Sequence, residues 1–119
     1  MRIDHIGYAV KNIDKAKKSM ETLGYSFEPT VEDRVRNIFI AFGEFDGYRV
    51  ELVAPMSKGS PVDMYLSKIG PTPYHVCYRS SDIEADIAEL QKTGLRFPSR
   101  WLRRLHLEIS GLYSCTPFQ

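Results

Sequence analysis

Apolar and polar positions follow the same order twice along the chain. Each copy begins with a short run of branched and aromatic residues around a histidine, IDHIGYAV in the first and YHVCY in the second. A polar residue, an amphipathic helical stripe, a glycine and another β-like run then follow in both. The offset is 70 residues, so that His5 corresponds to His75 and Gly24 to Gly94. Two copies are too few for a solenoid, so the pattern predicts a duplicated module whose equivalent strands face each other across a pseudo-twofold axis.

The first copy predicts the order β-α-β-β-β. Asn12 is a suitable N-cap for a helix with one apolar stripe, and Gly24 fits the left-handed residue that commonly ends a helix. The run EFDG ends in Asp-Gly at Gly47, which favours a hairpin turn between two strands. The predicted strands of this module are residues 3–10, 25–29, 35–42 and 48–54.

The second copy follows a polar connector that contains proline and glycine. Pro61 is placed to open a short helix within this connector. Ser81 and Glu84 have the spacing of a capping box at the start of the second amphipathic helix. Gly94 ends that helix, and another strand is predicted to begin at residues 95–97.

Beyond Pro98 the repeated pattern ends. Alternation at Leu105, Leu107 and Ile109 fits a strand, and a basic helical turn from Ser99 fits equally well. The run does not supply a hairpin and last strand like those of the first copy. We therefore predict a single domain of 119 residues, with module one at 1–54, a connector at 55–72 and an incomplete module two at 73–119.

The bulk composition argues against several partners. Lysine and arginine together number 16 and aspartate and glutamate 15, so no strong field favours nucleic acid or an anionic membrane. No apolar stretch is long enough to span a bilayer. Cys77 and Cys115 have no metal-binding or redox spacing. We expect a cytoplasmic protein with neither a nucleic-acid nor a membrane partner.

The candidate site consists of His5, Glu51 and His75. The two histidines occupy equivalent positions of the repeat, and Glu51 interrupts the apolar run VELV near the end of module one. Buried carboxylates are rare unless they are paired or bind a cation. Two neutral imidazoles and one carboxylate suit a divalent transition metal. The alternative stays open at this point: the histidines are ordinary packed residues, and Glu51 faces solvent or pairs with an arginine.

Two further residues are candidates for substrate binding. Asn37 falls in the predicted strand 35–42 on a register that could face the cleft. Arg49 shares a strand face with Glu51 and could bind an anionic group. An ordinary surface position is the alternative for each. Cys77 is expected to be a small buried thiol. The chain has no Gly-rich phosphate loop and no Gly-x-Ser-x-Gly elbow, which argues against nucleotide binding and serine hydrolysis.

At these residues the chain resembles the vicinal oxygen chelate superfamily, which includes glyoxalase I, methylmalonyl-CoA epimerase, extradiol dioxygenases and bleomycin resistance proteins. The matching stretches are IDHIGYAVKNIDKA, YRVELVAP, SPVDMYLSKIG and YHVCYRSSDIEADIAELQKTG, within residues 3–97. The connector is similar to that of the methylmalonyl-CoA epimerase and bacterial glyoxalase-like branch. The resemblance implies an α+β fold in which paired βαβββ modules form a cup-shaped mixed sheet around a divalent metal, with the second module incomplete here. It implies His5, Glu51 and His75 as the metal ligands.

One family feature has no secure counterpart in the chain. Relatives carry a fourth ligand, a glutamate in a closing strand of the type GLIELLE. Glu108 precedes a Gly-Leu pair but comes too early after His75 to be that residue. The segment from Ser99 onward departs from the family pattern, so we expect the cup to lack its closing wall.

The resemblance implies an enzyme that binds zinc, nickel, cobalt or manganese and acts on a small molecule. Its chemistry is proton transfer next to the carbonyl of a thioester or hemithioacetal, as in methylmalonyl-CoA epimerase, an isomerase, or lactoylglutathione lyase. Glu51 is then also a candidate catalytic base. The alternatives are a metal-free ligand-sequestering protein of the bleomycin-resistance type and a degenerate, inactive member of the family, with extradiol dioxygenase chemistry ranked last. Homodimers are common in the superfamily, and a homodimer is predicted.

Overall fold

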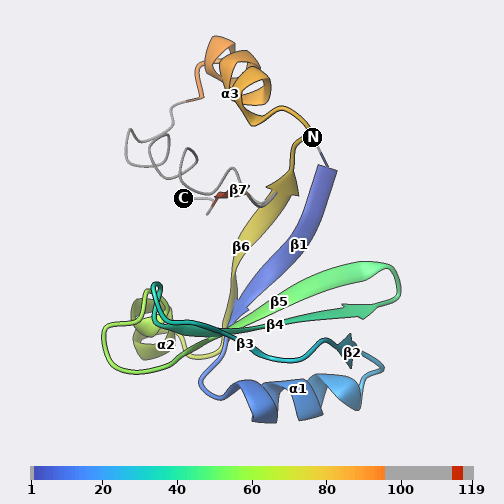
Figure 1. Ribbon diagram of the computed structural model, residues 1–119, viewed down its shortest axis with the longest axis vertical. Helices are drawn as coiled ribbons and strands as arrows, with labels where there is room; N and C mark the ends of the chain where they lie inside the picture. Colours follow the sequence, from blue (N-terminus) through green and yellow to red (C-terminus); the bar gives the residue numbers. More distant parts are fainter. Residues whose placement is uncertain (1, 96–113, 117–119) are drawn as a thin grey trace.

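The computed structural model describes residues 2–95 and 114–116, which build one mixed sheet and three helices (Figure 1). In chain order the elements are β1 (Arg2–Ala9), α1 (Ile13–Glu21), β2 (Ser26–Phe27), β3 (Val31–Asp33), β4 (Ile38–Phe45), β5 (Tyr48–Pro55), α2 (Asp63–Lys68), β6 (Thr72–Arg79), α3 (Ile83–Lys92) and β7 (Ser114–Thr116). The sheet runs in the order β2-β4-β5-β1-β6-β7, and β3 pairs with β4. The predicted α+β class with a mixed sheet is confirmed.

The centre of the sheet joins the two modules. β1 runs parallel to β5, which forms an antiparallel hairpin with β4. On its other side β1 runs antiparallel to β6, the first strand of the second copy. β6 in turn pairs with β7. Within residues 2–95 and 114–116, no helix combines the length and apolar character needed to cross a membrane.

The pairing of β1 with β6 has the symmetry expected of a duplicated module. The central pairs are Ile6 with Val76, His5 with Cys77, and Gly7 with His75. Equivalent residues are 70 positions apart, so Ile6 pairs with its own equivalent, Val76. The pair His5–Cys77 is likewise equivalent to the pair Gly7–His75, because residue 5 corresponds to residue 75 and residue 7 to residue 77. The register shifts on both sides of this centre, between Ile3 and His5 and between Gly7 and Tyr8. The predicted face-to-face arrangement of equivalent strands is therefore confirmed.

Two apolar clusters lie on opposite faces of the sheet. Alternate residues of a strand point to opposite faces, and β5 divides accordingly. Leu52 and Ala54 pack in the cluster that contains Ile13 of α1, whereas Val53 packs in the cluster that contains Val62 before α2. All of these residues are buried. Burial of this kind stabilises the fold by roughly 25 cal/mol per Å² of apolar surface. Residue 51 has the parity of Val53 and so lies on the face away from α1.

Some strand boundaries differ from the prediction. β4 begins at Ile38 instead of residue 35, because a turn precedes it in which the Asp33 carboxylate accepts hydrogen bonds from the backbone and side chain of Arg36. In that turn Asn37 has a φ of 58°, and Val35 is 98% exposed. The short strand β3 was not predicted, since its sequence VED has little β-strand character. β2 covers only part of the predicted segment 25–29.

The N-caps of α1 and α3 occupy equivalent positions of the repeat, and the predicted capping-box motif does not mark the N-cap of α3. Asn12 caps α1 as predicted, with its Oδ1 accepting from the backbone N–H of Lys15 at 2.9 Å. In the second copy the N-cap is Asp82, which accepts from the backbone N–H of Ala85 at 3.0 Å. The predicted capping box of Ser81 and Glu84 is therefore wrong, because the capping position is the one equivalent to Asn12.

The rest of the second module is described only in part. Gly94 follows α3 with a φ of 87°, as predicted for the residue that ends this helix. The strand expected at 95–97 and both alternatives for 99–109 fall on residues outside the described ranges, apart from Leu95. The described piece of this region is β7, where Cys115 lies opposite Cys77.

Replacement of Asp82 by alanine should lower the free energy of unfolding by about 1 kcal/mol, because the first turn of α3 loses its side-chain cap. Ser81→Ala is the matched control and should change it by much less. Urea unfolding followed by circular dichroism measures both. Equal losses in the two variants would contradict the assignment of Asp82 as the cap.

Candidate metal centre

Three neighbouring strands bring the candidate residues together. Gly7 in β1 lies opposite Glu51 in β5 and also opposite His75 in β6. His5 lies two residues before Gly7 on the same strand face. The three side chains therefore meet around a single glycine, and the predicted convergence of His5, Glu51 and His75 is observed.

Gly7 is the residue that makes this convergence sterically possible. A Cβ atom placed on it would lie 2.0 Å from Cε1 and 2.3 Å from Nδ1 of His75. These separations are far shorter than any van der Waals contact, so the ring of His75 fills the space that a side chain would take. The sequence places Gly7 in the first histidine strand, but the need for a residue without a side chain there becomes evident only from the strand register.

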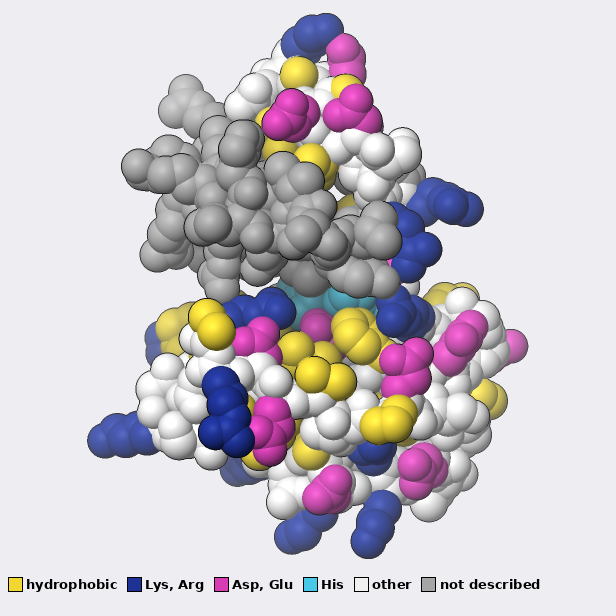
Figure 2. All heavy atoms as spheres, viewed as in Figure 1, with side chains coloured by type: hydrophobic (Ala, Val, Ile, Leu, Met, Phe, Trp, Pro, Cys, Tyr) yellow, Lys and Arg dark blue, Asp and Glu magenta, His cyan; other side chains and the backbone are white. Residues whose placement is uncertain are grey.

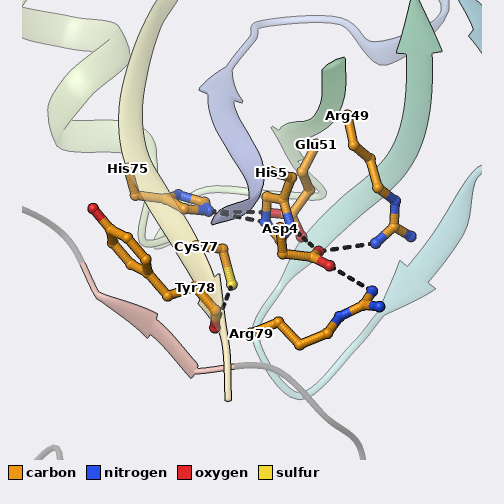
Figure 3. A network of polar contacts seen from close by, with 8 residues as sticks. All are labelled: Asp4, His5, Arg49, Glu51, His75, Cys77, Tyr78 and Arg79. Carbon is orange, nitrogen blue, oxygen red and sulfur yellow. Dashed lines mark hydrogen bonds and ion pairs between the residues drawn. The ribbon is translucent and has the colours of Figure 1, made fainter. Parts of the chain in front are cut away.

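The three candidate ligand atoms form a small, nearly equilateral triangle (Figure 3). Nε2 of His5 lies 3.4 Å from Nε2 of His75, and each of these nitrogens lies 3.2 Å from Oε2 of Glu51. Both histidines and the glutamate are buried, and His5 is only 1% exposed. Figure 2 shows the histidine side chains gathered at one place, with basic side chains on either side.

The triangle has the dimensions of a metal site. A tetrahedral ion bound at about 2.0–2.1 Å holds its ligand atoms about 3.3–3.4 Å apart, close to the spacings observed here. Two imidazole nitrogens and one carboxylate oxygen are ligands that suit zinc, nickel, cobalt and manganese. Without a cation or added protons, three electron pairs would converge in a buried space at an electrostatic cost. The residues present therefore fit a divalent metal.

The electrostatics of Glu51 support its role as an anion within the triangle. Burial acts to raise the pKa of Glu51, but its close contacts with the rings of His5 and His75, and the positive charge of each imidazole when it is protonated, outweigh this effect. The resulting pKa is about 2. Glu51 thus stays ionised at neutral pH and supplies negative charge to the site.

Behind His5 lies a second group of charges that the sequence reasoning missed. Oδ2 of Asp4 accepts hydrogen bonds from Nδ1 of His5 at 2.8 Å and from Nη1 of Arg49 at 2.9 Å. Its Oδ1 is paired with Arg79. Burial acts to raise the pKa of Asp4, but the hydrogen bond from His5 and the charges of Arg49 and Arg79 hold the pKa below the ordinary aspartate value.

The two residues predicted to bind substrate have structural partners. Asn37 lies in the turn before β4, where its side-chain amide donates to the backbone oxygens of Ser57 and Lys58, so it does not have the strand register predicted for it. Arg49 lies beside Asp4 and over the ring of Phe42, with its Cζ atom 4.2 Å from the ring centroid. Substrate binding by either residue stays a prediction.

A model of one protein superfamily matches most of the chain. The model is described as glyoxalase/bleomycin resistance protein/dioxygenase superfamily and matches residues 4–110. The chain is 30% identical over 106 residues to the uncharacterized protein YqjC of Bacillus subtilis, covering 87% of this chain and 74% of that protein. It is 28% identical to an ethylmalonyl-CoA/methylmalonyl-CoA epimerase of Cereibacter sphaeroides, covering 80% of this chain and 72% of that protein.

A solved structure with the same fold contains a CoA ligand. A methylmalonyl-CoA epimerase of Streptomyces coelicolor, in complex with 2-nitronate-propionyl-CoA, superposes with a TM-score of 0.68. It is 27% identical to this chain, and the similarity covers 81% of this chain and 74% of that one.

The lowered pKa of Glu51 predicts how the stability of the metal-free protein depends on pH. The pKa of Glu51 is about 2 in the folded chain, against an ordinary value of 4.5. The ionised carboxylate therefore stabilises the fold fully above pH 4.5. That contribution is lost as the pH falls from 4.5 towards 2. In Glu51→Gln this acid-dependent loss should be absent, so its unfolding free energy should fall less between about pH 5 and about pH 3.

Chemical denaturation across this pH range, in the presence of a chelator, measures the effect. Glu44→Gln, which alters an exposed glutamate on the adjacent strand β4, is the matched control. Parallel pH profiles for Glu51→Gln and the unmodified chain would contradict the buried ion pairs.

Proposed function

Because the chain belongs to the glyoxalase/bleomycin resistance protein/dioxygenase superfamily, we propose that it is a metal-dependent epimerase of a CoA thioester. His5, Glu51 and His75 hold the metal in this proposal. The observation that carries it is the buried triangle of ligand atoms, none more than 3.4 Å from the next. The choice of substrate class rests on the relatives, which are named as epimerases of methylmalonyl-CoA and ethylmalonyl-CoA.

The reaction exchanges a proton on the carbon next to a thioester carbonyl. A divalent ion held by this chain would polarise that carbonyl and stabilise the negative charge that develops on its oxygen. The protein's part is to provide neutral imidazole nitrogens from His5 and His75 and one negative charge from Glu51. Their burial keeps competing water away and strengthens every electrostatic interaction at the site.

We propose that Glu51 acts mainly as a metal ligand. A general base works best when its pKa lies near the working pH, and Glu51 has a pKa of about 2. The contacts that keep it ionised therefore make it a weak proton acceptor. Its action as the catalytic base stays a prediction, as does the homodimer.

Isomerisation of a hemithioacetal, as by a lactoylglutathione lyase, is the alternative within the same chemistry, since it also removes a proton next to a carbonyl. A metal-free binding protein has no need of three ionisable groups within 3.4 Å of one another in a buried position. The site therefore favours a metal-dependent enzyme over ligand sequestration.

The proposal predicts deuterium exchange into methylmalonyl-CoA. The purified chain loaded with cobalt or zinc should exchange the proton at the carbon between the two carbonyl groups in D2O, as followed by mass spectrometry. His5→Ala and His75→Ala should reduce the exchange to near the uncatalysed rate and should lose the metal, measured by elemental analysis. Glu44→Gln is the control that should keep both.

Two results would contradict the proposal in different ways. Absence of bound metal in the unmodified chain would overturn the metal site itself. Stoichiometric metal without exchange of methylmalonyl-CoA, but with turnover of the methylglyoxal–glutathione adduct, would keep the site and overturn the substrate class.

A further inference from the structure

We propose that Asp4 is a positioning residue that fixes the tautomer and direction of His5, so that the lone pair of its Nε2 is directed at the metal. This inference rests on the metal site proposed above. Three features of the described residues support it: a local irregularity in β1, the hydrogen-bonding chemistry of a carboxylate, and a pair of arginines that holds Asp4 in place.

The irregularity explains how Asp4 reaches His5 at all. Consecutive residues of a regular strand point to opposite faces of the sheet, and Asp4 directly precedes His5. Their side chains nevertheless meet, with Oδ2 of Asp4 2.8 Å from Nδ1 of His5. The register of β1 against β6 shifts between Ile3 and His5. Such irregularities redirect side chains in strands, and here one brings the carboxylate to the histidine (Figure 3).

The chemistry of this contact fixes the position of a proton. An ionised carboxylate can only accept hydrogen bonds, so the hydrogen shared with Asp4 belongs to Nδ1 of His5. A neutral imidazole carries a single N–H, and Nε2 is therefore the unprotonated nitrogen. That nitrogen is the one that lies 3.2 Å from Glu51 and 3.4 Å from His75. Asp4 thus selects the tautomer that can bind a metal within the triangle.

Arg49 and Arg79 hold the carboxylate in this orientation. The side chain of Asp4 is only 4% exposed, Arg49 contacts the same oxygen as His5, and Arg79 contacts the other oxygen. The arginines come from β5 and β6, the two strands that also supply Glu51 and His75. Ligands and supporting charges are therefore fixed by the same strand pairing.

The second copy of the module holds its histidine by a different contact. The position equivalent to Asp4 is Tyr74, whose ring lies edge-on to the ring of His75, with centroids 4.4 Å apart. Such a ring contact restricts the orientation of the histidine, but the ring of a tyrosine does not accept a hydrogen bond from an imidazole N–H in the way a carboxylate does. The residue before the histidine therefore differs between the two copies, and His75 serves as an internal reference for His5.

The first measurement is the tautomer of His5 in the metal-free chain, by long-range ¹H–¹⁵N correlation NMR at a pH where the ring is neutral. We expect the Nδ1–H form in the unmodified chain and a shift towards the Nε2–H form in Asp4→Asn, because an amide can also donate to Nδ1. The signals of His75 should keep their tautomer. An Nε2–H form of His5 in the unmodified chain would overturn the inference.

The second measurement is cobalt affinity, by titration of the visible absorption band. Asp4→Asn should weaken binding roughly 10- to 100-fold, as is usual when the partner of a ligating histidine is lost. Arg79→Gln, a milder change at a half-exposed residue, should weaken it less and in the same direction. Asp33→Asn is the matched control, since Asp33 also pairs with an arginine but in the turn before β4.

The outcomes separate this inference from the proposed function. Unchanged cobalt affinity in folded Asp4→Asn and in Arg79→Gln, with normal binding in the unmodified chain, would overturn the positioning role and leave the metal site intact. Absence of cobalt binding in the unmodified chain would overturn the proposed function together with the part of this inference that concerns metal. Deuterium exchange without any effect of Asp4→Asn on affinity or tautomer would overturn only the role of Asp4.

Discussion

The register of β1 between β5 and β6 is the constraint on which the rest of the site depends. Because Gly7 lies opposite Glu51 on one side and His75 on the other, a single position of β1 determines which side chains meet. A slip of one residue would turn the partners to the opposite face of the sheet. The apolar clusters on both faces oppose such a slip, since β5 contributes buried residues to each. The packing of these apolar clusters therefore helps to keep His5, Glu51 and His75 in contact.

The charges around this register form an ordered series. Arg49 and Arg79 pair with Asp4, Asp4 accepts a hydrogen bond from Nδ1 of His5, and His5 faces Glu51 together with His75. Each buried charge has a partner of opposite sign or a hydrogen-bond donor, which is the condition for keeping ionised groups out of water. Among the described residues of this series, the innermost triangle combines three electron-rich atoms, and a divalent cation there would balance their charge.

The sequence singles out the three candidate ligands because they stand out from their surroundings. His5 and His75 are equivalent in the repeat, and Glu51 interrupts an apolar run. The superfamily that these residues suggested is confirmed. Asp4 could not be found in this way, because strand alternation places it on the opposite face from His5 until the register shift is known. Asn37 was misplaced for a related reason: the hydrogen bonds of Asp33 to Arg36, which delay the start of β4, depend on a turn that the apolar pattern does not reveal.

The repeat also has a consequence for the order in which the protein folds. The β4–β5 hairpin forms between segments close in sequence, whereas β1 and β6 join residues 70 positions apart. Contacts of such long sequence separation carry a larger loop-closure cost and generally slow folding. The three candidate ligands come together only after this closure, so an ion bound by the triangle would stabilise the native chain but not a chain in which only the hairpin had formed. A bound divalent ion would therefore hold together the two modules at the strand pairing with this long sequence separation.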